Sequence, residues 1–387
     1  MVAPMILDNN ELLKPYASCF SKPQFTHFKH LTNCLSACEI PSLNRYAALH
    51  TKSRSSLNRF LTQSTWQVED VKKVYHQEVK DYLKPHSFLL IDDTLSHRPY
   101  AKAVEKANYH YDHTINGQSL GYSIVTATAV TGNNIIPYNL LCYYRKEDCT
   151  DRQYQSKNTI AEEIILSTQN ISSISTVIFD SWYSNDIVIG ACKQAGKHFI
   201  TIIKSNRNVT LHYQKCAVDV LAQKKDLLPW EEFQHEERTF RSQTYSVFIH
   251  SIGSVKLVIS QLYDDKNKKW GDKCYLISDM IEKSAQELVK EYLIRSGIES
   301  FHREAKQNVG LEGYFLRNNR GIERYLFLVM LTYALLVLQS IDLKESMTIG
   351  EACEKKKIQI FSWAMERAYE HPSEREFILQ AIAKARV

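Results

Sequence analysis

Two acidic residues of the chain end apolar segments, in surroundings suited to chemistry on phosphates. Asp93 lies at the end of the run SFLLIDDT, and Asp180 ends a second run, STVIFD. Both runs are typical of buried strands, and acids at the ends of central strands lie where α/β sheets usually place their chemistry. A single acid there often only caps the following helix, but two such acids suggest a shared site.

A third acid, Glu299, lies in the segment EYLIRSGIESFHREAKQNVG, whose spacing predicts one helix. At about 100° per residue, four polar residues fall within an arc of roughly 60°: Tyr292, Arg295, Glu299 and Lys306. The far side carries apolar residues that would pack on the core: Ile294, Ile298, Phe301, Ala305 and Val309. A solvated helix with surface ion pairs has the same pattern, so the stripe alone identifies no site.

Clustered carboxylates have a specific chemical use, because their hard oxygens bind Mg²⁺ or Mn²⁺. Two such ions about 3.5–4 Å apart can activate a water or a 3′-hydroxyl on one side of a phosphate and stabilise the leaving oxygen on the other. The chain has no GxSxG or HExxH motif, and its nine cysteines lack the spacing of a zinc site. Metal-assisted phosphoryl transfer is therefore the chemistry that the sequence favours.

The order of the predicted elements indicates a mixed α/β protein. The first 85 or so residues read as helices, and strand patterns begin at Ser87. GQSLGYSIVTATAV and NNIIPYNLLCYY suggest an antiparallel meander, and helices are expected over 158–169 and in a segment that stops at Gly196. Strand-rich segments continue to about Ser278, and helices follow.

Composition sets wider limits. With 387 residues, two or three folding units are expected, and 44% hydrophobic residues are enough for a sizeable core. The net charge of +5 leans towards an anionic partner without naming one. The first residues do not resemble a signal peptide, and scattered cysteines favour a reduced intracellular compartment. The longest apolar run, Tyr325–Leu338, is too short for a membrane span and is expected to be a core helix.

Residues 40–71 combine basic and aromatic side chains in short helical stretches. The basic residues are Arg45, Lys52, Arg54 and Arg59. They could form a DNA reader of the helix-turn-helix kind, which inserts a short basic helix into the major groove. A small helical cap with a solvated basic face would have the same composition, and both interpretations stay open.

Taken together, these motifs resemble the DDE transposases of bacterial insertion sequences, particularly the insertion sequence 4 group and its 701-type relatives. That group is recognised by a tyrosine, an arginine three residues later, a glutamate four after that and a lysine seven after that. The stripe on the Glu299 helix has this spacing. IDDT at 91–94 resembles the first-acid motif and FDSWYS at 179–184 the second, so the likeness covers roughly residues 85–340.

The resemblance implies a ribonuclease H-like catalytic core with a β-rich insertion, flanked by helical regions. The expected regions are a helical, DNA-binding N-terminal region at 1–85, catalytic core at 86–197, a β-rich insertion at 198–280, the rest of the core at 281–340 and a helical C-terminal region at 341–387. It also implies that Asp93, Asp180 and Glu299 are catalytic and hold two Mg²⁺ ions per active site, for which Mn²⁺ can substitute. Tyr292, Arg295 and Lys306 would contact DNA phosphates. Trp270, in a lysine-rich loop, would stack on a flipped base.

The first motif contains two adjacent acids, Asp92 and Asp93, and a strand points them to opposite sides. Only one of them can face the metal ions. The resemblance favours the acid directly before the threonine, which is Asp93, and leaves Asp92 as the alternative.

The implied activity is cut-and-paste transposition on terminal inverted repeats. The expected partners are double-stranded DNA, as transposon ends and as target, and a second copy of the chain, because joining two ends needs two active sites. The expected place is the bacterial cytoplasm at the nucleoid, with no membrane. The alternatives are a ribonuclease H-like nuclease without strand transfer, an adopted transposase that only binds DNA, and a scaffold whose acids are caps and surface charges.

Overall fold

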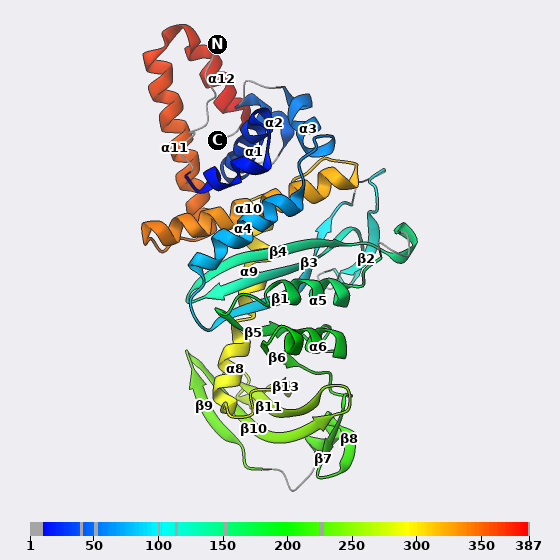
Figure 1. Ribbon diagram of the computed structural model, residues 1–387. Helices are drawn as coiled ribbons and strands as arrows, with labels where there is room; N and C mark the ends of the chain where they lie inside the picture. Colours follow the sequence, from blue (N-terminus) through cyan, green and yellow to red (C-terminus); the bar gives the residue numbers. More distant parts are fainter. Residues whose placement is uncertain are drawn as a thin grey trace.

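The computed structural model of the chain describes residues 11–38, 42–49, 53–99, 101, 103–112, 115–149, 154–223 and 228–385. One large mixed sheet runs through it, with helices on both faces and a helical region at one end (Figure 1). The expected mixed α/β architecture is therefore confirmed.

The N-terminal region is helical over its described residues, as predicted. It consists of a 3-10 helix, Glu11–Cys19, followed by α1 (Lys22–Ala37), α2 (Leu43–Ala48), α3 (Arg54–Thr62) and α4 (Val68–Tyr82). Side-chain oxygens of Ser42 and Ser53 accept the first free amides of α2 and α3, which fixes where these short helices begin. Of the basic residues in this stretch, Lys52 lies outside the described residues.

The sheet is built from strands far apart in the sequence. The strands are β1 (Ser87–His97), β2 (Asn108–Asp112), β3 (Gly117–Thr131), β4 (Asn134–Tyr143), β5 (Ile174–Phe179), β6 (His198–Ile202), β7 (Asn208–Leu211), β8 (Gln214–Ala217), β9 (Glu231–His235), β10 (Arg238–Ile249), β11 (Gly253–Asp264), β12 (Lys269–Trp270) and β13 (Cys274–Ser278). Their order is β2-β3-β1-β5-β6-β13-β11-β10-β7-β8, with β4 on β3, β9 on β10 and β12 on β11. Within the described residues, parallel pairing is confined to β1, β5 and β6, and β3 and β4 form the predicted antiparallel pair.

The segment expected as a β-rich insertion shares this sheet with the rest of the chain. β6 pairs with β5 on one side and with β13 on the other, and β13 pairs with β11. Hydrogen bonding therefore continues from β1 into the β10–β11 hairpin.

Helices cover both faces of the central strands. α5 (Lys157–Ser167) and α6 (Asp186–Gln194) lie on one face, and α8 (Ala285–Leu293) with the start of α9 (Ser296–Asn308) lies on the other (Figure 1). α6 begins where the Asn185 side chain accepts two backbone amides, and it ends just before Gly196, whose φ of 67° suits a left-handed turn. The predicted stop at Gly196 is thereby confirmed.

The helix predicted around Glu299 differs from its expected form. The chain makes two helices, α8 and α9, separated at Ile294 and Arg295, instead of one continuous helix. The break lies directly before Ser296 and Gly297, and glycine weakens helices by about 1 kcal/mol relative to alanine. The backbone stays in the right-handed helical region at both residues of the junction, Ile294 and Arg295.

The apolar run predicted as a core helix forms part of α10 (Asn319–Leu343). It is the one helix among the described residues that is long and apolar enough to cross a membrane by composition, but 78% of its most apolar window is buried inside the protein. α11 (Ile349–Glu370), a short 3-10 turn (Pro372–Glu374) and α12 (Arg375–Ala385) complete the chain.

The buried side chain of Arg324 joins α10 to the N-terminal helices. Its guanidinium donates to the carbonyl oxygens of four residues in the α3–α4 connection and lies 4.3 Å from the centre of the Trp66 ring. The acceptors are Phe60, Leu61, Ser64 and Trp66. One cation thus supplies donors to a whole connection, although the carbonyls of Phe60 and Ser64 also accept from Trp66 Nε1 and from Arg320.

Replacing Arg324 should therefore destabilise the fold much more than replacing its exposed neighbour. Arg324→Leu removes the side-chain donor to the carbonyls of Leu61 and Trp66 and the contact with the Trp66 ring, and we expect the free energy of unfolding to fall by about 3 kcal/mol or more. Arg320→Leu, which removes one exposed bond to the Ser64 carbonyl, should cost less than about 1 kcal/mol. Urea denaturation of both variants checks this, and equal losses would contradict the assigned role.

His76 on α4 should make stability depend on pH. Its ring stacks on Tyr138 at 4.3 Å and its Nε2 lies 3.0 Å from the Tyr138 carbonyl oxygen. Burial lowers the pKa of His76 to about 4, so the folded protein holds it neutral. The contribution of the neutral His76 to the free energy of unfolding is complete above the pKa of histidine in the unfolded chain, about 6.5. It is lost as pH falls towards 4, at up to about 1.4 kcal/mol per pH unit.

We therefore expect His76→Gln to lose stability less steeply than wild type as pH falls from about 7 to about 5. Urea unfolding of both proteins across this range is the measurement. Parallel losses in the two proteins would mean that His76 is not held neutral.

Candidate active site

The pairing of β1 with β5 brings Asp92 and Asp180 to the same face of the sheet. Ile91 of β1 is opposite Phe179 of β5, and the next residue in each segment is an aspartate. Leu90 and Ile178, two residues earlier, lie in the apolar cluster beneath α8 and α9. Because side chains alternate along a strand, Asp92 and Asp180 continue that face at the end of the apolar layer.

The first turn of α9 carries the third acid to this edge. Ile298 is fully buried in the same cluster, and Gly297 lies against Leu90 and Ile135. A Cβ atom at position 297 would come within 3.4 Å of Leu90 and 3.3 Å of Ile135, tighter than most packed side chains allow. The glycine thus permits close packing of α9 on β1, next to Asp92.

Arg295 connects two of the acids directly. Its Nη2 lies 2.7 Å from Asp92 Oδ2, and its Nη1 lies 2.6 Å from Glu299 Oε1. The arginine side chain is largely buried, whereas that of Glu299 is 58% exposed. A planar guanidinium suits such a double contact, because its donors point in fixed directions.

The pKa of Asp92 reflects its burial and the charges around it. Burial raises the pKa of Asp92 to about 7; Arg295 opposes this rise, while the charges of Asp180 and Asp93 add to it. Burial thus disfavours the charged form of this carboxyl group, and a cation bound close to it would favour that form.

The donor set can be tested against a divalent metal ion. Within the described part of the chain, no group of three or more His, Cys, Asp or Glu side chains is arranged to hold a metal. Arg295 bridges Asp92 and Glu299, and Glu299 is exposed enough to change rotamer. Asp92 and Asp180, joined by Glu299, supply the hard oxygen ligands that Mg²⁺ and Mn²⁺ prefer, so the residues fit such an ion.

Asp93 faces the other side of the sheet, towards α5. Its carboxylate pairs with Lys157 Nζ at 2.7 Å and accepts from the Tyr183 hydroxyl at 3.1 Å and from Ser123 Oγ at 3.4 Å. Of the two adjacent acids, Asp92 therefore shares a face with Asp180 and lies near Glu299, whereas Asp93 has a separate set of partners. The resemblance to a family had favoured Asp93.

The remaining residues singled out in the sequence lie in different surroundings. Tyr292, on α8, is close enough for its pKa to be affected by Arg295, Asp180 and Asp92, and burial raises that pKa. Lys306, on α9, donates to the Leu95 carbonyl at 2.8 Å and lies 3.4 Å from Glu312. Trp270, on β12, packs against Tyr263 and Arg241, away from the three acids in sequence and in the sheet order.

Two further residues attach α9 to the sheet and were missed from the sequence. His302 Nε2 lies 2.7 Å from Thr126 Oγ1, and Thr126 donates to the Asp92 backbone carbonyl at 3.2 Å. Burial lowers the pKa of His302 to about 3, so this bond is made by a neutral imidazole. The sequence offered one local sign of this role: His302 follows Glu299 by three residues, so the two lie on neighbouring turns of the same helix.

The second-acid motif contributes more than its aspartate. Asp180 Oδ1 accepts from the backbone amides of Trp182 at 3.0 Å and Tyr183 at 3.4 Å, and Thr201 Oγ1 donates to its carbonyl. These bonds fix the turn after β5. They also hold Tyr183 where its hydroxyl reaches Asp93.

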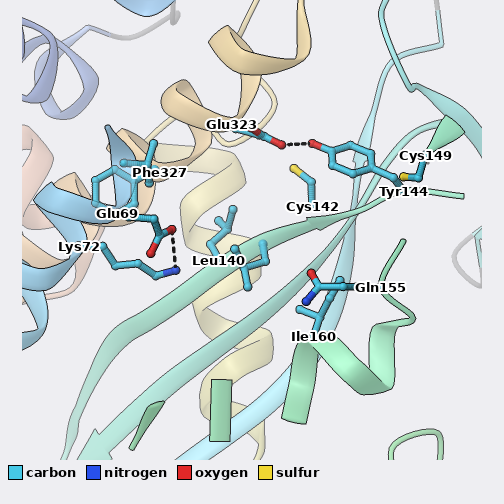
Figure 2. Close-up of a pocket in the computed structure, with 12 residues that line it drawn as sticks. Glu69, Lys72, Leu140, Cys142, Tyr144, Cys149, Gln155, Ile160, Glu323 and Phe327 are labelled. Atoms are coloured by element: carbon cyan, nitrogen blue, oxygen red, sulfur yellow. Dashed lines mark hydrogen bonds and ion pairs between the residues drawn. The ribbon is translucent and has the colours of Figure 1, made fainter. Parts of the chain in front are cut away.

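A cavity of about 240 Å³ lies between α4, β4 and α10, on another part of the protein (Figure 2). Its polar side chains pair with one another: Lys72 with Glu69 at 3.3 Å, and Tyr144 with Glu323 at 2.5 Å (Figure 2). Because these charges and hydroxyls are already partnered, the cavity has no set of ligands for a metal.

The chain is similar to known proteins of one kind. The family model of the DDE superfamily endonucleases matches residues 42–226, a range that contains Asp92, Asp93 and Asp180 and ends before Glu299. The probable transposase for insertion sequence element IS701 of Microchaete diplosiphon is 23% identical over 334 residues, which cover 83% of this chain and 85% of that protein. These two matches confirm that the chain resembles the DDE transposases of insertion sequences, of the IS701 type, over most of its length.

Proposed function

We propose that this protein is a DNA transposase that cuts and rejoins the ends of an insertion sequence. The observation that carries the proposal is the arrangement of Asp92, Asp180, Arg295 and Glu299 at one edge of the sheet. The similarity to a probable IS701 transposase supports the choice of DNA as substrate.

Asp92, Asp180 and Glu299 are the residues that would hold divalent metal ions. When bound, a pair of such ions supplies activation of the attacking oxygen and stabilisation of the leaving oxygen. The carboxylates fix the position of this charge beside the scissile phosphate. In cleavage, a water oxygen would bond to the phosphorus as the bond to the 3′ oxygen breaks, leaving a 3′-hydroxyl and a 5′-phosphate. In joining, the freed 3′-hydroxyl would attack a phosphorus of the target and displace its 3′ oxygen, which leaves as a hydroxyl.

Basic and phenolic groups around the acids would hold the DNA strand. Arg295 can exchange one carboxylate for a phosphate, because both present two oxygens to its planar donors. Tyr292 lies on α8 one turn before Arg295, and Lys306 lies in the last turn of α9; both would contact phosphates of the same strand. The natural partner is double-stranded DNA in the bacterial cytoplasm, and we expect two copies of the chain on a pair of transposon ends.

The three acids should be essential for cleavage. We expect Asp92→Asn, Asp180→Asn and Glu299→Gln each to reduce Mg²⁺-dependent nicking of a duplex carrying the element's terminal repeat by more than about 100-fold. Removing even an outer partner of a metal ligand costs about 10- to 100-fold, and these are the ligands themselves. The measurement is nicking of labelled DNA, with melting temperatures as the control for folding.

Joined products in the same reaction would distinguish a transposase from a nuclease without strand transfer. If all three variants nicked the duplex at the rate of the wild-type protein, the proposed site would be wrong. Binding of the repeat without cleavage by wild type would favour a DNA-binding role instead.

The two adjacent acids should behave differently. Asp93→Asn keeps the shape of the side chain but removes the ion pair with Lys157, so we expect a lower melting temperature and less than about a ten-fold loss of nicking. Asp92→Asn, its matched control on the opposite face, should abolish nicking. The reverse result, with Asp93→Asn inactive and Asp92→Asn active, would make Asp93 the metal ligand.

A further inference from the structure

Trp182 presents an exposed indole, and its backbone amide contacts Asp180, one of the proposed catalytic acids. Its side chain is 48% exposed, and it is the one tryptophan of the five, all of which are described, that lies among the exposed large hydrophobic residues. Burying aromatic surface is a major source of stability, so an indole left half exposed is available to bind another molecule. The residue lies two positions after Asp180, in the turn that follows β5.

The turn holds the indole in a defined place. Asp180 accepts the amide of Trp182 at 3.0 Å, so the carboxylate proposed to bind metal also fixes the backbone of the tryptophan. Tyr183 contacts the ring edge-on at 4.9 Å and is itself fully buried. The ring is thus supported on one side while much of its surface stays open to solvent.

Positive charge lies next to this ring. Lys157 Nζ is 5.3 Å from the centre of the Trp182 ring and 5.7 Å from that of Tyr143, and it is anchored by Asp93. Burial lowers the pKa of nearby His110 to about 4, and the charges of Lys157 and Arg145 contribute to that shift. An aromatic face beside cations is the combination that binds single-stranded nucleic acid, through base stacking and phosphate attraction.

Trp270, which the resemblance favoured for base stacking, is more fully covered than Trp182 and does not lie among the exposed large hydrophobic residues. The Arg241 guanidinium lies 4.4 Å from the Trp270 ring centre and 4.4 Å from that of Trp230. Arg241 is held there by two bonds to Gln261, and Tyr263 contacts Trp270 edge-on. A base could reach that face of Trp270 only after this Trp–Arg–Trp stack opened.

We propose that Trp182, rather than Trp270, stacks on an unpaired nucleobase of the DNA strand next to the cut, with Lys157 attracting the adjoining phosphate. This inference rests on the proposed function and names the residue that positions the strand. Because every base presents a flat aromatic face, a tryptophan can stack on any of the four, and we expect no base preference at this place.

The test uses the full chain and a short duplex with a single-stranded tail that carries 2-aminopurine, a base whose fluorescence falls when it stacks. Binding is measured without divalent metal, so that it is independent of cleavage. We expect Trp182→Ala to weaken binding of the tailed duplex by about 5- to 100-fold and to lose the quenching. Trp182→Phe should retain part of both, and Trp363→Ala on the distant helix α11 is the matched control.

The outcomes separate this inference from the function on which it rests. Unchanged quenching in Trp182→Ala, or its loss in Trp270→Ala alone, would overturn the role of Trp182 and leave the transposase proposal intact. Equal weakening for Trp182→Ala and Trp182→Phe, with a lowered melting temperature in both, would show that the ring only supports the fold. A wild-type protein that binds neither tailed nor blunt duplex would overturn both proposals.

Discussion

The parallel pairing of β1 with β5 is the constraint on which the candidate site depends. Its register places Ile91 opposite Phe179, so the two following aspartates, Asp92 and Asp180, end neighbouring strands on one face. A slip of one residue would turn every side chain of β1 over and bring Asp93 to that face instead. The register is held by the buried apolar side chains on both faces, since Leu89 and Ile91 lie in one cluster and Leu90 in the other.

The packing of α9 completes this arrangement and gives it its electrostatic character. Gly297 lets the helix approach β1 closely, and Thr126 and His302 fasten it further along. Arg295 then lies between Asp92 and Glu299, where one guanidinium offsets part of the charge of the clustered carboxylates. The guanidinium thus keeps Asp92 and Glu299 close to one another.

Much of this could be predicted from local patterns, and the rest could not. The helices and strands follow from apolar periodicity and from caps such as Asn185 and Gly196, which act within a few residues. The sequence also showed that Asp92 and Asp93 point to opposite sides, because alternation is a local property.

Which side meets α9 depends on the pairing of strands 87 residues apart, and no local pattern specifies that pairing. Lys157, the partner of Asp93, lies 64 residues from it and carried no signal in the sequence. The break before α9 was not predicted, because the polar stripe and the apolar face keep the spacing of one helix across Ser296 and Gly297.

The most direct test of the central claim, that Asp92, Asp180 and Glu299 form one metal site, is a crystal structure of the protein with Mn²⁺ and repeat-end DNA. The anomalous signal of manganese locates the ion independently of any assumption about ligands. The account predicts a peak about 2.0–2.3 Å from carboxylate oxygens of Asp92 and Asp180, with Glu299 turned away from Arg295 to join them. A peak bound by Asp93 on the opposite face of β1, or no peak at this edge of the sheet, would contradict it.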